Sequence, residues 1–299
     1  MIVKKRRENM KKVIITVAQT GAFHGKELNP NIPTQPDEIA ASAYDCYNAG
    51  ASIVHVHTRD KDDRSSCDTD TFAEINSKIR SRCNLILQNS TAPPTKPGSV
   101  ADEGLAALKL PPEVRPEMCS LDCSLITTSW GDLTWIYMWT RDWIMKTAKR
   151  MRELNIKPEL EIFNIETLED VFDIYQPAGI LDDPISLSFV MGMNKISQGA
   201  ISYSEQNLDF MISKLPKDQN VNFSTISIGS KTHLTVVVQT LLKGGNVRVG
   251  FEDNVYYNKG ELAKSNAQMV ERVVRIIHEL GMEVATPDEA RQILKLKKM

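Results

Sequence analysis

Short apolar runs alternate with longer amphipathic segments along most of the chain. Residues 13–18 form a continuous, β-branched apolar run. Such a run is too short for a buried helix and is typical of a strand buried on both faces in a parallel sheet. The next segment opens at residues 34–37 with a proline-containing capping sequence and runs to Asn48, before Gly50. That pattern predicts a helix.

The same alternation continues to residue 280 and gives eight strand-then-helix units. The predicted strands are residues 13–18, 52–57, 84–88, 117–121, 157–162, 185–189, 222–228 and 247–249. The predicted helices are residues 34–48, 70–82, 99–109, 135–154, 167–176, 207–213, 233–243 and 265–280. Eight such units without an internal linker predict an α/β protein, a (β/α)8 TIM barrel that forms a single domain over residues 13–299. An extra C-terminal helix is expected from Thr286, because Thr-Pro-Asp-Glu is a strong helix start.

An open doubly wound sheet is the alternative architecture. It requires a glycine-rich phosphate-binding sequence after an early strand, and this chain has none. Residues 1–12 are basic and lack the apolar core of a signal peptide. We therefore expect a basic N-terminal tail there, with Met1 or Met10 as the start.

Composition narrows the class of protein. A formal net charge of −2 over 299 residues argues against a nucleic-acid-binding protein, which would carry a basic surface. The five cysteines form neither a C-x-x-C pair nor a zinc-finger pattern, so reduced intracellular thiols are the simplest account. No apolar run approaches the roughly 20 residues that cross a membrane. We expect a cytoplasmic protein that binds neither membranes nor nucleic acids.

Two of the five histidines, His55 and His57, end the second predicted strand. Because side chains alternate along a strand, both imidazoles point to the same side, with Cα atoms roughly 6–7 Å apart, close enough to share one metal ion. The alternative is a polar pair on the solvated face of an edge strand. The charged residues 59–64 follow directly, as expected where a buried strand reaches the catalytic rim of a barrel, and this favours the metal site.

A carboxylate for the same metal is available after the eighth strand, at Glu252 and Asp253. Two imidazoles and a carboxylate with open positions form a catalytic metal site, which favours zinc, with iron or manganese as alternatives. The same carboxylates could equally belong to a solvated turn. Arg248 lies between two valines and should point into the barrel, where it either grips a substrate carboxylate or pairs internally with Glu252 or Asp253.

Other side chains carry weaker signals. Ser90 and Ser120, at the ends of predicted strands, could donate hydrogen bonds to a substrate carboxylate or act as structural donors. Lys231 follows the seventh strand, where barrels often bind phosphate, so it could contact a nucleotide-bearing cofactor; an ordinary surface lysine is the alternative. Three tryptophans recur every fourth residue and predict one helix face, used in the core or in a subunit contact. They are Trp135, Trp139 and Trp143.

Several stretches together resemble one known family. They are Thr20-Gly21-Ala22, His55-Val56-His57 with Arg59-Asp60, Glu117-Met118 before Ser120-Leu121, and residues 244–254, which read Gly-Gly-Asn-Val-Arg-Val-Gly-Phe-Glu-Asp-Asn. The chain resembles the β-keto acid cleavage enzymes, best known through the 3-keto-5-aminohexanoate cleavage enzyme, from Val13 to Leu296. The Gly-Gly-x-x-Arg-x-Gly-x-Glu-Asp-Asn sequence is the specific part of this likeness.

The resemblance implies a zinc-bearing (β/α)8 barrel that condenses a β-keto acid with acetyl-CoA and gives acetoacetate and a new acyl-CoA. It also implies a homo-oligomer. Matched by position, the metal would be held by His55, His57 and Glu252. Arg248 and Asp253 would be catalytic, and Ser90 and Ser120 would bind the substrate, with Ser120 where the aminohexanoate enzyme has threonine.

One position departs from the family's pattern. Phe23 stands where the aminohexanoate enzyme carries the glutamate that would pair with the substrate's amine. An ammonium group buried there would lack a partner. We therefore expect a β-keto acid with a neutral or apolar substituent, or with a quaternary ammonium faced by aromatic rings. Residues 127–143 also depart from the family's pattern.

Two other functions are compatible with the motifs. A metal-dependent hydrolase or aldolase could use the same barrel, although an amidohydrolase has its His-x-His on the first strand and needs more histidines. A ligand-binding barrel without turnover is the second alternative. The joint presence of the metal-ligand and catalytic residue types argues against it.

Overall fold

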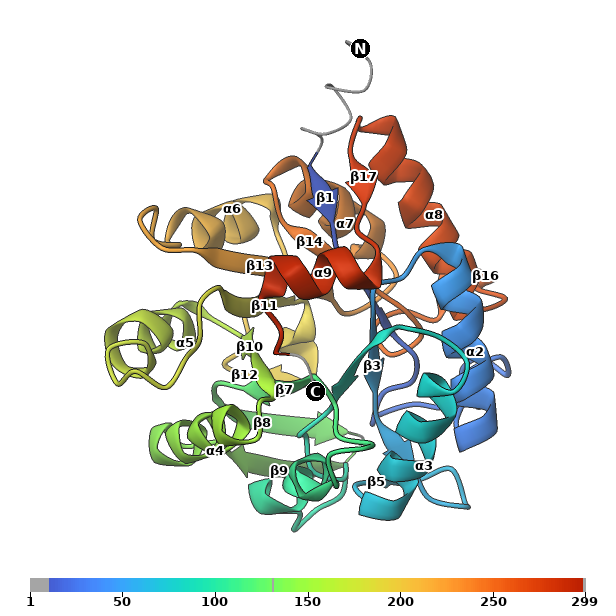
Figure 1. Cartoon of the computed structure of the whole chain (residues 1–299), viewed down its shortest axis with the longest axis horizontal. Coiled ribbons are helices and arrows are strands. Elements are labelled where there is room, and N and C mark those ends of the chain that lie inside the picture. The colour runs from blue at the N-terminus through green and yellow to red at the C-terminus, as the bar shows by residue number, and fades with distance from the viewer. Residues whose placement is uncertain (1–10, 131, 298–299) are drawn as a thin grey trace.

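The computed structural model describes residues 11–130 and 132–297. Eight parallel strands close into a barrel in the order β10-β11-β13-β14-β2-β3-β6-β7. The predicted (β/α)8 TIM barrel is thereby confirmed, with helices around the ring of strands (Figure 1). The barrel strands are β2 (Ile15–Ala18), β3 (Ile53–Val56), β6 (Ile86–Asn89), β7 (Met118–Asp122), β10 (Lys157–Ile162), β11 (Ile185–Met191), β13 (Val221–Ser227) and β14 (Asn246–Val249).

Helices connect the strands along the outside of the barrel. They are α2 (Pro36–Ala49), α3 (Thr69–Arg80), α4 (Arg141–Glu153), α5 (Ile165–Asp170), α6 (Glu205–Ser213), α7 (His233–Leu242), α8 (Asn266–Glu279) and α9 (Pro287–Leu294), with shorter helical segments η1 (Ala101–Lys109), η2 (Val171–Tyr175) and η3 (Met193–Lys195). The predicted helix at 99–109 is the 3₁₀ segment η1. Among the described residues, no helix combines the length and apolar character that crossing a membrane requires.

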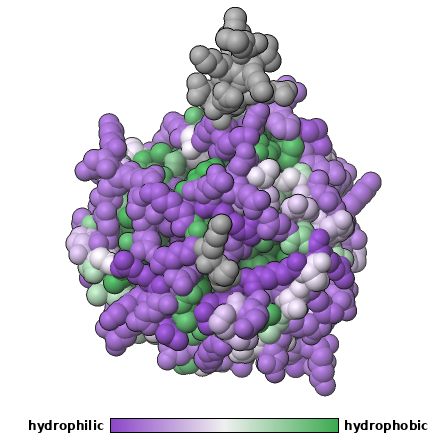
Figure 2. All heavy atoms as spheres, viewed as in Figure 1, coloured by the Kyte–Doolittle hydropathy of each residue, from purple (hydrophilic) through white to green (hydrophobic). Residues whose placement is uncertain are grey.

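The C-terminal helix closes one end of the barrel. α9 starts as predicted at Thr286, whose hydroxyl accepts a hydrogen bond from the backbone N–H of Glu289 at 3.3 Å. Its Ala290 and Leu294 pack on residues at the starts of four barrel strands, namely Ile14, Ile53, Ile86 and Met118. α9 lies across the ring of strands in Figure 1, and Figure 2 shows that this face is mainly hydrophilic. The opposite, carboxyl end of the strands is therefore the end that can hold a site.

Short two-stranded pairs lie around the barrel. They are β1 (Lys12–Val13) with β17 (Glu283–Val284), β4 (Thr58–Arg59) with β5 (Ser65–Ser66), and β15 (Tyr256–Asn258) with β16 (Glu261–Leu262). Of the tail predicted over residues 1–12, Lys12 belongs to β1, and residues 1–10, with both candidate start methionines, lie outside the described residues.

The segment after β7 differs from the prediction. β8 (Leu125–Trp130) and β9 (Leu133–Met138) form an antiparallel hairpin, and β12 (Ser197–Gln198) pairs with β8. α4 begins only at Arg141, so the helix predicted over 135–154 is wrong in its first part. The three tryptophans share no helix face, since only Trp143 lies in α4.

Two-residue alternation explains the hairpin. Tyr137 and Trp139 are buried, whereas Ile136 and Met138 between and beside them are exposed, as in a strand with one face packed. Aromatic and β-branched residues favour strands, and this segment is rich in both. A spacing of four residues between tryptophans fits a helix and a strand equally well, so it could not distinguish between them. The structure shows a strand at the first of these tryptophans.

Candidate active site

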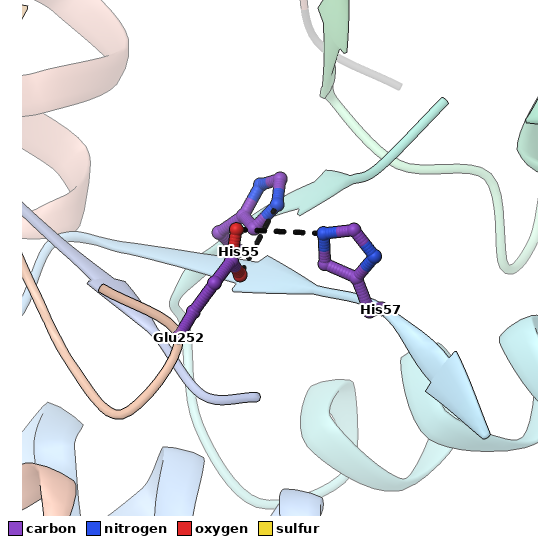
Figure 3. A group of neighbouring side chains, drawn as sticks. All are labelled: His55, His57 and Glu252. Carbon is purple, nitrogen blue, oxygen red and sulfur yellow. Dashed lines mark ion pairs between the residues drawn. The ribbon is translucent and has the colours of Figure 1, made fainter. Parts of the chain in front are cut away.

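Two histidines face the barrel interior at the carboxyl end of β3. His55 lies within the strand and His57 directly after it, and both are buried. The two imidazole centroids are 5.1 Å apart. Figure 3 shows both rings turned toward the carboxylate of Glu252, which comes from the loop after β14. The sequence-predicted histidine pair and carboxylate therefore meet in space.

Each carboxylate oxygen of Glu252 faces one imidazole. Oε2 lies 3.6 Å from Nε2 of His55, and Oε1 lies 3.5 Å from Nε2 of His57. One potential ligand atom from each residue lies within 4.8 Å of the others. Oε2 is buried and has no hydrogen-bond donor among the described residues. Two imidazole nitrogens and one carboxylate oxygen are the ligand set of a catalytic zinc site, so these residues fit a divalent cation.

The charges around this cluster favour a cation as well. Burial alone would raise the pKa of Glu252, but the guanidinium of Arg248 and the two imidazoles outweigh burial and hold that pKa well below its usual range. Burial lowers the pKa of His55 to about 3, so its imidazole is neutral near pH 7. Ionised carboxylates and neutral imidazoles are the forms that bind metals.

Close backbone packing positions Glu252. Gly250 has a φ of +139°, and a Cβ on it would lie 2.1 Å from a backbone carbonyl oxygen of β2, so the turn after β14 requires glycine. A Cβ on Gly21 would lie 2.6 Å from Cγ of Glu252. From the start of α8, Asn266 Oδ1 accepts a hydrogen bond from the backbone N–H of Phe251 at 2.8 Å. Glycines and this asparagine together fix the loop that carries the carboxylate.

Arg248 points into the barrel and contacts both neighbouring carboxylates. Its Nε and Nη2 donate to Asp253 at 3.0 and 2.9 Å, and Nη2 also donates to Glu252. Its Nη1 has no hydrogen-bond acceptor among the described residues and lies 3.8 Å from Oε1 of Glu161. The ion pair predicted between Arg248 and the neighbouring carboxylates is therefore present. It leaves the Nη1 group of Arg248 available to bind an anion. Burial raises the pKa of Asp253, although Arg248 opposes this shift.

A cavity of about 410 Å³ opens beside these groups. His57, Arg248, Glu252 and Asp253 form part of its wall. Most of the remaining described wall is apolar or aromatic. It includes Phe23, Leu28, Ile126, Tyr137, Trp139, Val190, Met193, Ile196, Ile226, Ile228, Val255 and Tyr256.

Sequence comparison identifies the family. A profile described as "beta-keto acid cleavage enzyme" matches residues 12–296, a range that contains the whole site. The chain belongs to this family. A Fusobacterium nucleatum "3-keto-5-aminohexanoate cleavage enzyme" is 40% identical over 290 residues, which cover 97% of this chain and 100% of that protein. A Rhizobium meliloti "3-dehydrocarnitine:acetyl-CoA trimethylamine transferase" is 32% identical over 304 residues, which cover 96% and 98% respectively.

A solved structure shares the fold of this β-keto acid cleavage enzyme family member. It is described as "Binary complex of ObcA with oxaloacetate" and superposes with a TM-score of 0.78 over 90% of this chain and 68% of the other, at 19% identity. At that identity the likeness concerns the barrel alone. Family membership makes the chain an enzyme, an acyltransferase.

The residues predicted to bind the substrate or, for Lys231, a cofactor differ in their relation to the cavity of this family member. Phe23 is part of its wall. Ser90 follows β6, where its hydroxyl accepts a hydrogen bond from the backbone N–H of Ala92 at 3.1 Å, and Ser120 is buried within β7. Lys231 is exposed in the turn before α7. Within the described part of the chain, these two serines and the lysine are not among the cavity-lining residues, and their roles remain predictions.

Sequence reasoning missed one carboxyl group of the cavity, Glu161. It is the register partner of Asp122 across β10 and β7. Burial raises the pKa of Asp122 to about 6, and burial together with the Asp122 charge raises the pKa of Glu161 well above its usual range. The signal was present in β10, where Glu159 and Glu161 alternate with apolar residues and so share the inner face. Glu161 lies within β10, so considering only the residues at the ends of strands does not reveal it.

Proposed function

We propose that this enzyme catalyses a metal-dependent, Claisen-type acyl exchange in which a β-keto acid and acetyl-CoA give acetoacetate and a new acyl-CoA. The observation that carries the proposal is the His55, His57 and Glu252 cluster beside the Arg248–Asp253 pair in one cavity. A divalent cation, zinc by its ligand set, would supply Lewis acidity there that polarises the β-keto carbonyl group. The name of the Rhizobium relative supports acetyl-CoA as the co-substrate.

Arg248 and Asp253 supply the proton and charge chemistry. The Nη1 side of Arg248 binds the substrate carboxylate and orients C2 toward Asp253. Asp253 accepts the C2 proton, and burial, which raises its pKa, makes it the stronger base. The C2 carbanion attacks the carbonyl carbon of acetyl-CoA and expels the CoA thiolate.

The second half of the reaction runs the same steps in reverse. The thiolate attacks the original keto carbon, the bond from that carbon to C2 breaks, and the new acyl-CoA forms. Asp253 returns the proton to the acetoacetate carbanion. The exchange needs no oxidant or reductant and no covalent bond to the enzyme.

The wall around Phe23 supports a neutral or apolar substituent on the β-keto acid. Apart from Glu252, Asp253 and Glu161, which all lie near Arg248, the described cavity wall contains no carboxyl group that could pair with a primary ammonium group. A buried ammonium without a partner is unfavourable. The Fusobacterium relative is named for an amine-bearing acid. We therefore propose that the two enzymes use β-keto acids with different substituents.

A quaternary ammonium substituent is the second candidate. Phe23, Tyr137, Trp139 and Tyr256 bring aromatic rings to the cavity wall, and the rings of Tyr137 and Trp139 lie 5.0 Å apart. Aromatic rings attract such cations without a hydrogen-bond acceptor. The Rhizobium relative is named for a substrate with a trimethylamine group.

A coupled assay tests the reaction and the substituent together. Purified, metal-analysed protein is incubated with acetyl-CoA and a panel of β-keto acids with apolar, ammonium and trimethylammonium substituents, and acetoacetate and acyl-CoA are both measured. We expect acetoacetate only with acetyl-CoA present, and its loss in His57→Ala and Asp253→Asn. Bound metal without acetoacetate from any acid would favour the hydrolase or aldolase. Neither metal nor turnover would favour the binding protein.

We further propose a homo-oligomer in the cytoplasm. The outer face of the β8–β9 hairpin exposes Leu125, Ile136 and Met138, with 53%, 55% and 55% of their surfaces accessible. Exposed apolar side chains that cluster in this way are typical of contact surfaces. Light scattering on the wild type and on Ile136→Lys tests this, and a monomeric wild type would refute it.

A further inference from the structure

A chain of buried polar side chains runs from His55 across the barrel interior, away from the cavity. Nδ1 of His55 is 2.9 Å from Oε1 of Gln88 on β6, and Nε2 of Gln88 donates to Oε2 of Glu159 on β10. Oε1 of Glu159 accepts from the hydroxyls of Ser188 on β11 and Ser224 on β13. All five side chains belong to buried residues, and they come from five different strands.

Apolar side chains normally fill the layers inside such a barrel, so this polar chain needs a reason. Polar groups in a core are unfavourable unless each finds a partner, and a set that is fully paired fixes one arrangement of its members. Here the carboxylate of Glu159 accepts from two hydroxyls and one amide. These hydrogen bonds therefore determine which group faces His55 at the other end of the series of side chains.

The direction of the hydrogen bonds follows from the chemistry of each group. Glu159, as a carboxylate, only accepts, so the Gln88 amide must present its NH₂ group to Glu159. Its carbonyl oxygen then faces His55, where it only accepts as well. Nδ1 of His55 must carry the hydrogen, and Nε2, which faces Glu252 at 3.6 Å, keeps its electron pair.

We propose that Glu159 is a positioning residue, which acts through Gln88 to hold His55 in the Nδ1–H tautomer with Nε2 free to bind the metal. This inference rests on the metal site of the proposed function, and it concerns a residue outside that site. A partner that fixes the tautomer of a ligand histidine affects metal affinity strongly, by about 10- to 100-fold when it is removed.

The sharpest variant is Glu159→Gln, which keeps the size of the side chain. A glutamine at 159 offers an NH₂ group to Gln88, so the Gln88 amide can turn over and present its own NH₂ group to Nδ1 of His55. The Nε2–H tautomer then appears. Exchanging the two groups, Gln88→Glu with Glu159→Gln, should restore the wild-type tautomer, because the carboxylate at 88 accepts from His55 and from the amide at 159.

Two measurements test the proposal. Nitrogen-15 NMR of histidine-labelled, metal-free protein reports which ring nitrogen of each of the five histidines carries hydrogen, with His55 assigned by its loss in His55→Asn. Zinc affinity is measured by competition with a chelator. We expect Nδ1–H at His55 in the wild type, an Nε2–H population and about 10- to 100-fold weaker zinc binding in Glu159→Gln, and recovery of both in the exchanged double variant.

The matched control is Glu161→Gln, the same chemical change two residues along the same strand, which should leave the His55 tautomer unchanged. Nε2–H at His55 in the wild type would overturn the proposal without need of any variant, as would a Glu159→Gln protein with unchanged tautomer and affinity, or a double variant no better than the single one. Failure of the wild type to bind zinc would instead refute the proposed metal site. The metal-free tautomer would still decide the role of Glu159.

Discussion

Asp122 is buried, and Glu161 on the neighbouring strand is partly buried, with 14% of its side chain exposed; replacing Asp122 should stabilise the protein. Burial raises the pKa of Asp122 from 3.8 to about 6. Because the folded pKa lies above the unfolded value, this group favours the folded state only while it is protonated. Its ionisation in the folded protein is penalised, and Asp122→Asn removes that penalty.

The pKa gives the size and the pH window of the effect. The gap between 3.8 and about 6 corresponds to a penalty of about 3 kcal/mol once the group is fully ionised. The penalty develops as the pH rises from about 4 to about 6. At pH 5 roughly half of it is present, and at pH 8 all of it is. Asp122→Asn should therefore raise the free energy of unfolding by about 1.5 kcal/mol more at pH 8 than at pH 5.

Urea unfolding of metal-free protein at the two pH values measures this difference. Asp62→Asn is the control, because Asp62 is exposed and its replacement should change the free energy of unfolding equally at both pH values. If Asp122→Asn increases the free energy of unfolding equally at pH 5 and pH 8, or more at pH 5, then burial does not hold the proton on this pair.

Three further outcomes are expected. Gly21→Ala should weaken zinc binding by about tenfold or more, because the new Cβ would lie 2.6 Å from Cγ of Glu252. Gly25→Ala, in the same loop but facing only the ends of the Glu27 and Arg59 side chains, is the control, and equal zinc affinities of the two variants in chelator competition would contradict this expectation. Phe23→Glu should shift kcat/KM toward amine-bearing β-keto acids, with Phe23→Gln as the uncharged control. The prediction fails if the ratio of kcat/KM for amine-bearing to apolar acids is the same in both variants. Adding zinc at 100 times its Kd to metal-depleted protein should raise the free energy of unfolding by about 2.7 kcal/mol, and His57→Ala should abolish the gain in thermal unfolding.

Much of the fold could be predicted because it depends on local pattern. Buried parallel strands read as apolar runs, and their regular alternation with helices leaves few architectures besides the barrel. Alternation of side chains along a strand predicted that His55 and His57 point to the same side. The order of the barrel strands placed the loop after β14 close to β3. The meeting of these residues with Glu252 needed no information beyond those two rules.

The errors come from features that local pattern does not decide. Tryptophans four residues apart fit a helix face and also one side of a strand, and only packing against the barrel selects the β8–β9 hairpin. Gln88, Glu159 and Glu161 lie inside strands, where an apolar interior is the usual expectation, so their function depends on partners far away in sequence. Such partnerships appear only once the barrel has closed.

The β8–β9 hairpin has a consequence for how substrate range can change. Its strands pair with each other and with β12, not with the barrel, yet Ile126, Tyr137 and Trp139 from this segment line the cavity. The reacting groups, by contrast, are mounted on barrel strands and the loops that follow them. The part of the cavity wall formed by Ile126, Tyr137 and Trp139 thus lies on a piece of backbone separate from the reacting groups, whereas Phe23 lies in the loop after barrel strand β2. Grafting residues 124–140 from a relative with a different acid should transfer preference for the substituent while the transfer reaction itself continues.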